Sequence, residues 1–440
     1  MPLIVLAGSI LLLLLLIARF KVSAFLALLI ASFAVGLASG MSADRTLHSI
    51  LKGVGDTTAS VALILVFGAI LGKLIEESGA SHTISYAFTR VFGMPRLWLS
   101  VLITGFIVGL PMMYNAGFLV LIPLVYTLSA TTGVPLLNLG IPMCAALAAT
   151  HGFLPPHPAP TSIALMYGAD VNRTLLYGLI LTVPAMLLAG PVLARFFRNL
   201  KNTPPPELYR EREFRSEALP GLSTSLFTTM LPVLLMLAGA VAEMTARPES
   251  AILPVTRFLS DANVALFLAA MAAFYTLGVR MGRTMEAVMK NAGEAVASVS
   301  MVLLIIASGG AFKQVLMDCG TSAAIEKLAS GVHGSPILLA WGTAALLRLA
   351  VGSATVAGIT AAGILAPLVA HAGVPPELLV LATAAGSLMF SHFNDTAFWM
   401  FKEYFNASIR QTFAIWTVIE SIVAVAGLAG VLLLQFVVRK

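Results

Sequence analysis

The sequence predicts an all-α polytopic membrane protein built from two inverted-topology repeats, each with about five transmembrane helices, one re-entrant hairpin and one broken helix. Three observations lead to this fold class. Hydrophobic residues make up 59% of the 440 residues and charged residues only 10%, whereas soluble domains carry about a quarter charged residues. Several apolar runs approach the roughly 20 residues that cross a bilayer as a helix. Short motifs also recur in the same order in the two halves of the chain.

The apolar runs are the candidate membrane helices. No Lys or Arg precedes the first run, so it lacks the cationic region of a secretory signal and is expected to be retained. The runs cover residues 3–18, 22–38, 61–75, 175–194, 230–242, 264–277 and 415–438.

The composition excludes several classes of function. Two cysteines, Cys144 and Cys319, cannot form a disulfide framework, and no Cys/His cluster has the spacing of a metal site. No Walker A or dinucleotide-binding motif is present, so we expect no cofactor and neither ATP-driven transport nor nicotinamide chemistry. The formal net charge of +6 is spread over short loops, which indicates membrane orientation rather than nucleic-acid binding.

One long polar stretch, residues 195–225, divides the chain near its middle. We expect residues 1–200 to form the first repeat, residues 201–225 a cytoplasmic linker and residues 226–440 the second repeat. Motifs of the first half recur in the second at an offset of about 240 residues, as an internal duplication predicts. The pairs are Gly68 and Gly79 with Gly309 and Gly320, Pro123 with Pro367, Gly133 with Gly373, and His151 with His392.

Each repeat is expected to contain two interrupted segments. Small residues interrupt the apolar stretches at about 97–128 and 337–369, and we interpret both stretches as re-entrant hairpins. A second stretch in each half, at about 136–170 and 377–405, is interpreted as a broken helix. In the first of these, four prolines between residues 155 and 160 prevent a continuous helix. Broken backbone at membrane depth is tolerated only where protein or a water-filled cavity satisfies its polar groups.

The charge distribution predicts the orientation of the repeats. Arg19 and Lys21 place the first turn in the cytoplasm, where the basic linker is also expected. Tracing from these points puts a loop at residues 41–56 on one face and its equivalent at residues 280–290 on the other, as an inverted repeat requires. The same tracing places both chain termini on the periplasmic side.

The four interruptions are expected to converge on one site near the middle of the membrane. Helix N-termini attract an anion, and amide and hydroxyl side chains exchange hydrogen bonds with a polyhydroxylated molecule. These groups therefore favour a small, hydroxylated, anionic solute. The candidate substrate-binding residues are Tyr114, Asn115, His151, His157, Thr161, Ser353, Thr355, Asn394 and Thr396.

Asp395, His392 and His151 are the candidate proton-coupling residues, because ionisable groups at membrane depth are functional candidates by default. A buried, unpaired Asp395 would hold a proton, although the same side chain could cap the helix that follows it. The histidines could instead bond free carbonyls of the breaks. Arg348 could reach the substrate carboxylate, pair with an acid of another helix or extend its charged end towards the membrane surface. The same ambiguity holds for Glu420 in the last helix, where packing within the bundle is favoured.

Three segments resemble the gluconate permease family of proton symporters. They read G-L-P-M-M-Y-N-A-G-F at residues 109–118, H-G-F-L-P-P-H-P-A-P-T at 151–161 and S-H-F-N-D-T-A-F-W at 391–399. The resemblance covers essentially the whole chain. It implies uptake of gluconate or a related sugar acid together with protons, across a bacterial inner membrane. It also implies membership of a wider superfamily of homodimeric carriers that move their substrate by an elevator motion.

The residues leave other functions open. A sodium-coupled carboxylate carrier is the nearest alternative, because carbonyls at the hairpin tips beside Asn115 or Ser353 could coordinate an ion. Hexuronates and hydroxylated amino acids such as D-serine are alternative substrates. An intramembrane hydrolase is disfavoured, since the sequence has no H-E-x-x-H or G-x-S-x-G motif and no second acid spaced with Asp395. A channel is disfavoured because a site formed by two related halves is more elaborate than a pore requires.

Overall fold

The fold is helical throughout the part of the chain that the structure describes. The computed structural model describes residues 5, 8–9, 11–13, 15–200, 202–205, 219–246, 250–320, 335–369, 372–392 and 395–438. Within these ranges every regular element is a helix. Eight of these helices are long and apolar enough to cross a membrane, or nine spans result if the bent pair Ala80–Phe92 and Met94–Gly109 counts as one. The predicted class of all-α polytopic membrane protein is confirmed.

In the first half of the chain, the structure describes eight α-helices after a short π-helical segment, Leu15–Arg19. Short π- and 3₁₀-helical turns continue the last of them to Phe197. The helices are α2 (Ala24–Ala38), α3 (Ala43–Ser78), α4 (Ala80–Phe92), α5 (Leu97–Gly109), α6 (Tyr114–Thr132), α7 (Leu136–Phe153), α8 (Pro158–Tyr167) and α9 (Val171–Leu187).

Most of the predicted linker 201–225 lies outside the described residues. In the described part of the second half, the long helix α13 is followed by the apolar helices α15 and α16, and then by α17 and α18 on either side of a break. The helices are α10 (Leu222–Thr245), α11 (Ile252–Ser260), α12 (Ala262–Ala273), α13 (Met285–Asp318), α15 (Pro336–Val351), α16 (Ala354–Val369), α17 (Pro376–Gly386), α18 (Thr396–Tyr404), α19 (Ile409–Thr412) and α20 (Val418–Val438).

Helices α3 and α13 are much longer than their apolar cores, which corrects one prediction. The segments 41–56 and 280–290 are not two equivalent loops, because residues 43–56 lie within α3 and residues 285–290 within α13. Hydropathy detects only the part of a helix that is apolar. The polar first turns are helical because Ser42 and Thr284 cap them, each accepting a backbone hydrogen bond at 3.3 Å.

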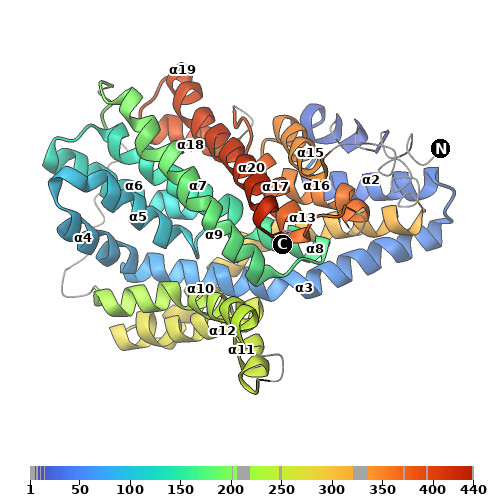
Figure 1. The fold of residues 1–440 in the computed structure, drawn as a ribbon, viewed down its shortest axis with the longest axis horizontal. Helices are drawn as coiled ribbons and strands as arrows, with labels where there is room; N and C mark the ends of the chain where they lie inside the picture. Colours follow the sequence, from blue (N-terminus) through green and yellow to red (C-terminus); the bar gives the residue numbers. More distant parts are fainter. Residues whose placement is uncertain are drawn as a thin grey trace.

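The two long helices pack against each other along their length and position the other elements. In Figure 1, α3 runs along the long axis, with α4, α5 and α6 at one end and α15 and α16 towards the other. Helices α10 and α12 pack against α3, and α11 packs against α10. Helices α5 and α6 therefore lie towards the opposite end of α3 from α15 and α16.

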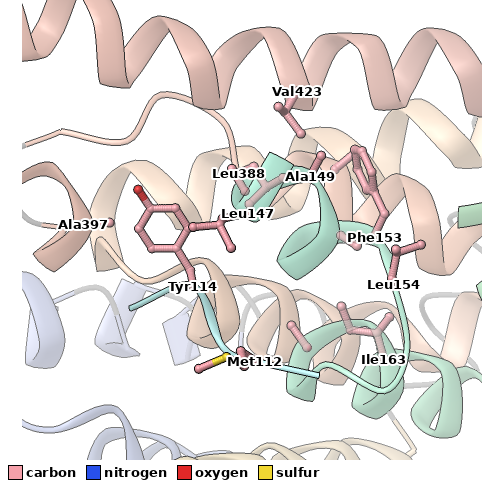
Figure 2. Packing of buried hydrophobic residues seen from close by; sticks show 14 of the residues in the cluster. Met112, Tyr114, Leu147, Ala149, Phe153, Leu154, Ile163, Leu388, Ala397 and Val423 are labelled. Atoms are coloured by element: carbon pink, nitrogen blue, oxygen red, sulfur yellow. The ribbon is translucent and has the colours of Figure 1, made fainter. Parts of the chain in front are cut away.

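The centre of the core is α7, which is buried on all sides. Sixteen of its 18 residues are buried, as expected for a helix that is apolar all round. Figure 2 shows Leu147 beside the ring of Tyr114, with Phe153 near Val423 of α20. Helix α7 packs against α5, α6, α9 and α20, so the break at its C-terminal end is enclosed by protein.

The crossing of α3 and α13 generates the first testable prediction. A Cβ atom on Gly53 would lie 2.5 Å from the carbonyl oxygen of Gly310, so Gly53→Ala forces the two backbones apart. We expect a loss of about 1–3 kcal/mol in the free energy of unfolding. Gly55→Ala is the matched control, since Gly55 is exposed on the same helix with open space around it. Equal melting temperatures of the two detergent-purified variants would contradict the prediction.

Candidate functional site

Three backbone interruptions line one cavity of roughly 230 Å³. They are residues 110–113 between α5 and α6, residues 352–353 between α15 and α16, and the break before α18. A fourth interruption, residues 154–157 between α7 and α8, does not line it, although Ala148 and His151 of α7 do. Helices α13 and α20 complete the lining, and Val302 and Ile305 of α13 form an apolar wall. We call it the central cavity.

Seven of the eleven candidate site residues line the central cavity. They are Tyr114, Asn115, His151, Ser353, Thr355, Asp395 and Thr396.

The other four candidates lie elsewhere. His157 lines a neighbouring cavity, and Thr161 is buried within α8 and lines neither of these two cavities. His392 bonds the carbonyl oxygen of Leu349 at 3.0 Å and does not line the central cavity. Asn394 lies outside the described residues. The sequence therefore predicts the polar lining of the cavity better than it predicts the role of each histidine.

Three helices begin at the wall of the central cavity. Tyr114 and Asn115 open α6, Ala354 and Thr355 open α16, and Thr396 opens α18; all five residues line the cavity. Each helix N-terminus carries roughly half an elementary positive charge on its unpaired N–H groups. Three such ends directed at one space make it favourable for a carboxylate, without a dedicated lysine or arginine.

A buried ion cluster forms one side of the cavity. Nη2 of Arg348 lies 2.5 Å from Oδ2 of Asp395 and 3.8 Å from Oε2 of Glu420. Its Nη1 donates a hydrogen bond to the carbonyl oxygen of Gly352 at the turn between α15 and α16. Arg348 is only 2% exposed and Glu420 only 4%. Of the roles considered for Arg348, the structure therefore contains the ion pair between elements.

Asp395 combines this ion pair with the helix-capping role. Its Oδ1 accepts the N–H of Ala397 at 3.0 Å, and its Oδ2 also accepts the hydroxyl of Ser391. The carboxyl group is therefore paired, in contrast to the unpaired acid considered from the sequence. Its neighbours hold the break in place: the indole N–H of Trp416 donates to Ser391 Oγ at 2.8 Å, and Thr417 Oγ1 donates to the Ser391 carbonyl at 2.5 Å.

Glu420 is absent from the candidate site residues of the sequence, which favours packing within the last helix for it. The structure places it at the lining of the central cavity beside Arg348. A signal was available, because Arg348 and Glu420 are each a lone charge within an apolar run and each needs a partner. Two such charges of opposite sign are candidates to pair with each other.

Two histidines connect the central cavity to a second cavity of roughly 240 Å³. His151 lines the first and His157 the second, and their Nδ1 atoms are 3.4 Å apart. The second cavity is otherwise lined by α3, α13 and the turn before α6, and it contains Lys73, Glu76 and Glu294. Met113 lines both cavities, so the turn formed by residues 110–113 is part of the wall between them.

Interrupted helices that surround a polar, ion-containing cavity are the architecture of secondary transporters. Solved transporter structures share the fold. The chain superposes on the YdaH transporter of Alcanivorax borkumensis with a TM-score of 0.65 at 14% identity, covering 94% of this chain and 98% of that one. It superposes on MtrF of Neisseria gonorrhoeae with a TM-score of 0.69 at 16% identity, covering 96% and 97%. The chain has the fold of these two membrane transport proteins.

The chain belongs to the GntP family of permeases, which it matches over residues 1–437. A high-affinity gluconate transporter of Escherichia coli strain K12 is 46% identical over 438 residues. The Gnt-II system L-idonate transporter of the same strain is 45% identical over 439 residues, and a gluconate permease of Bacillus subtilis strain 168 is 42% identical over 448. Each comparison covers 100% of both chains. The family resemblance of the three motifs is confirmed.

The ion cluster yields a prediction about stability. Arg348→Met leaves two acids buried without their cation, and we expect it to cost about 3–5 kcal/mol in the free energy of unfolding. The double variant Arg348→Met/Asp395→Asn removes one of those acids and should recover part of this loss. Thermal unfolding in detergent measures both effects. Arg173→Met is the control, since Arg173 is exposed on α9. A double variant as unstable as the single one would contradict the ion-pair assignment.

Proposed function

We propose that this permease imports gluconate or a closely related sugar acid together with protons, and that the substrate binds in the central cavity. One observation carries the proposal. The cavity combines three helix N-termini, hydroxyl and amide side chains, and a buried cluster with two acids for one arginine. The first two features suit a hydroxylated carboxylate, and the third suits an accompanying proton.

The substrate class is supported by the chemistry of the lining. Gluconate and L-idonate, named for the relatives, are both carboxylates with a chain of hydroxyl groups. The carboxylate would lie at the N-termini of α6 and α16, where N–H groups favour an anion. Tyr114, Asn115, Ser353, Thr355 and Thr396 would hydrogen-bond the hydroxyl groups, because amide and hydroxyl side chains both donate and accept.

The remaining candidates complete the proposed substrate set. His151 lines the cavity and would contact the substrate directly. His157 would act through His151, with which it shares the 3.4 Å contact. Thr161 would act by fixing α8, in which it is buried. Asn394 is retained from the sequence motif alone.

Proton coupling is supported by the charge of the cavity. With both acids ionised, Arg348, Asp395 and Glu420 carry a net charge of −1 in a buried position. Adding a substrate anion brings a further negative charge into a low-dielectric space, which is unfavourable unless a proton enters as well. We propose that Asp395 and His151 belong to the coupling network. His392, bonded to the Leu349 carbonyl, would act at its edge.

The wider proposal concerns how the protein works in the membrane. We propose that the chain consists of two inverted repeats, with re-entrant hairpins formed by α5–α6 and by α15–α16. We propose that it forms a homodimer in a bacterial inner membrane, with both termini on the periplasmic side. An elevator motion would carry the central cavity across the bilayer. The matching helix order of the two halves supports the repeats. The packing of both hairpins beside one cavity supports their moving together.

Uptake into proteoliposomes tests this function. Labelled gluconate should accumulate under an imposed pH gradient, and Asp395→Asn should lose accumulation because Arg348 then lacks its close anionic partner. Asp261→Asn is the control, since Asp261 caps α12 outside the central cavity and asparagine also caps helices well. Accumulation driven only by a sodium gradient would favour a sodium-coupled carrier. No uptake under either gradient would exclude gluconate, and unlabelled glucuronate or D-serine as competitors would then test the alternative substrates.

The binding role of α16 has its own test. Thr355→Val removes a hydroxyl from the cavity wall, and loss of one substrate hydrogen bond of about 1 kcal/mol should raise KM for gluconate roughly three- to tenfold. Thr360→Val makes the same substitution on the same helix at a buried position outside the cavity lining, so its KM should match the wild type. Equal KM values for both variants and the wild type would argue against a substrate contact at Thr355.

A further inference from the structure

We infer that Glu420 is the residue that carries the co-transported proton, while Asp395 remains the ionised partner of Arg348. This inference rests on the proposed proton coupling and assigns the proton to one side chain. It starts from a difference between the two acids of the cluster. Both lie beside the same guanidinium group, yet the structure gives them unequal numbers of hydrogen-bond donors.

Asp395 is surrounded by donors. Arg348 Nη2 lies 2.5 Å from its Oδ2, Ser391 Oγ donates to the same oxygen, and the N–H of Ala397 donates to Oδ1 at 3.0 Å. The carboxyl group also stands at the N-terminus of α18, where a negative charge is favoured. Each of these contacts stabilises the carboxylate form, and a proton would have to disrupt one of them.

Glu420 has only a longer contact with Arg348 among these compensations. Among the described residues its one ion-pair contact is with Arg348 Nη2 at 3.8 Å, which is beyond hydrogen-bond distance. The same nitrogen also pairs with Asp395 at 2.5 Å. The side chain projects from the long apolar helix α20 and is 4% exposed. A buried carboxylate with so few favourable contacts has a large desolvation penalty. Binding a proton neutralises the group and removes most of that penalty.

The surroundings of Glu420 contain no second cation to replace the proton in the described part of the chain. The cavity lining there supplies one permanently charged cation, Arg348, and one other ionised acid, Asp395. The titratable and charged groups that face Glu420 from the elements around it are Tyr114 of α6, Cys144 and His151 of α7, Arg348 of α15, and Asp395 of the break before α18.

This arrangement links the proton to the substrate. A proton from the outer aqueous phase binds a carboxylate oxygen of Glu420, which forms an O–H bond and makes the cluster neutral overall. The substrate anion then enters the cavity without adding to a net negative charge. On the inner side the substrate leaves, the O–H bond breaks and the proton returns to water. By linkage, proton and substrate each increase the affinity of the site for the other.

The test separates coupling from binding in one set of proteoliposomes. Glu420→Gln keeps the shape of the protonated acid but cannot release a proton. We expect it to retain substrate counterflow, which needs no proton movement, and to lose accumulation under a pH gradient, so that internal gluconate only reaches the external concentration. Glu377→Gln is the control, since Glu377 is a buried acid that accepts the N–H of Asp170 away from the central cavity. This variant should accumulate gluconate as the wild type does.

Each outcome decides the assignment. Proton-driven accumulation by Glu420→Gln would overturn it and leave the proposed function intact. Failure of the wild type itself to respond to a pH gradient would overturn both. If Glu420→Gln loses counterflow as well, Glu420→Asp becomes the deciding variant, because it retains a carboxyl group with a shorter side chain. Accumulation with a displaced pH midpoint would then support the assignment, whereas an unchanged midpoint would contradict it.

Discussion

The buried guanidinium group of Arg348 is the interaction on which the site depends. It bonds the carbonyl oxygen at the α15–α16 turn, pairs with Asp395 in the break before α18 and faces Glu420 on α20. Three segments distant in the chain are thereby held at one wall of the central cavity. Burying a cation and two carboxylates carries a large desolvation free energy. Attraction between the opposite charges offsets it only while the three groups remain together. The same constraint makes the cluster sensitive to the arrival of a proton or an anion.

The backbone breaks serve both the fold and the site. A helix that stops inside a membrane protein leaves N–H and carbonyl groups that need partners. Two side chains supply such partners at the second broken helix: Asp395 accepts the N–H of Ala397, and Thr417 donates to the carbonyl oxygen of Ser391. The first residues of α6 and α16 line the cavity, where the positive ends of these helices would favour a bound carboxylate. The polar groups exposed by the interruptions are thus the ones that a sugar acid would use.

The histidine pair gives the central cavity a polar connection to a second space between α3 and α13. These two long helices pack closely enough that Gly53 and Gly310 meet backbone to backbone. The second cavity lies against this rigid pair, with Lys73, Glu76 and Glu294 in its lining. His151 of the central cavity and His157 of the second cavity approach each other to 3.4 Å between their Nδ1 atoms.

The sequence by itself determined the features that depend on neighbours along the chain. Apolar composition fixed the membrane class, prolines 155–160 ended α7, and the polar residues of the interruptions identified most of the cavity lining. Hydropathy could not reveal the polar first turns of α3 and α13, because a capped polar segment can be helical outside the apolar core. Only the tertiary structure decided that Glu420 shares the guanidinium group of Arg348 and that His157 faces a different cavity from His151. Such pairings are set by the packing of helices far apart in sequence, and the compensation of a buried charge depends on distances that local sequence does not encode.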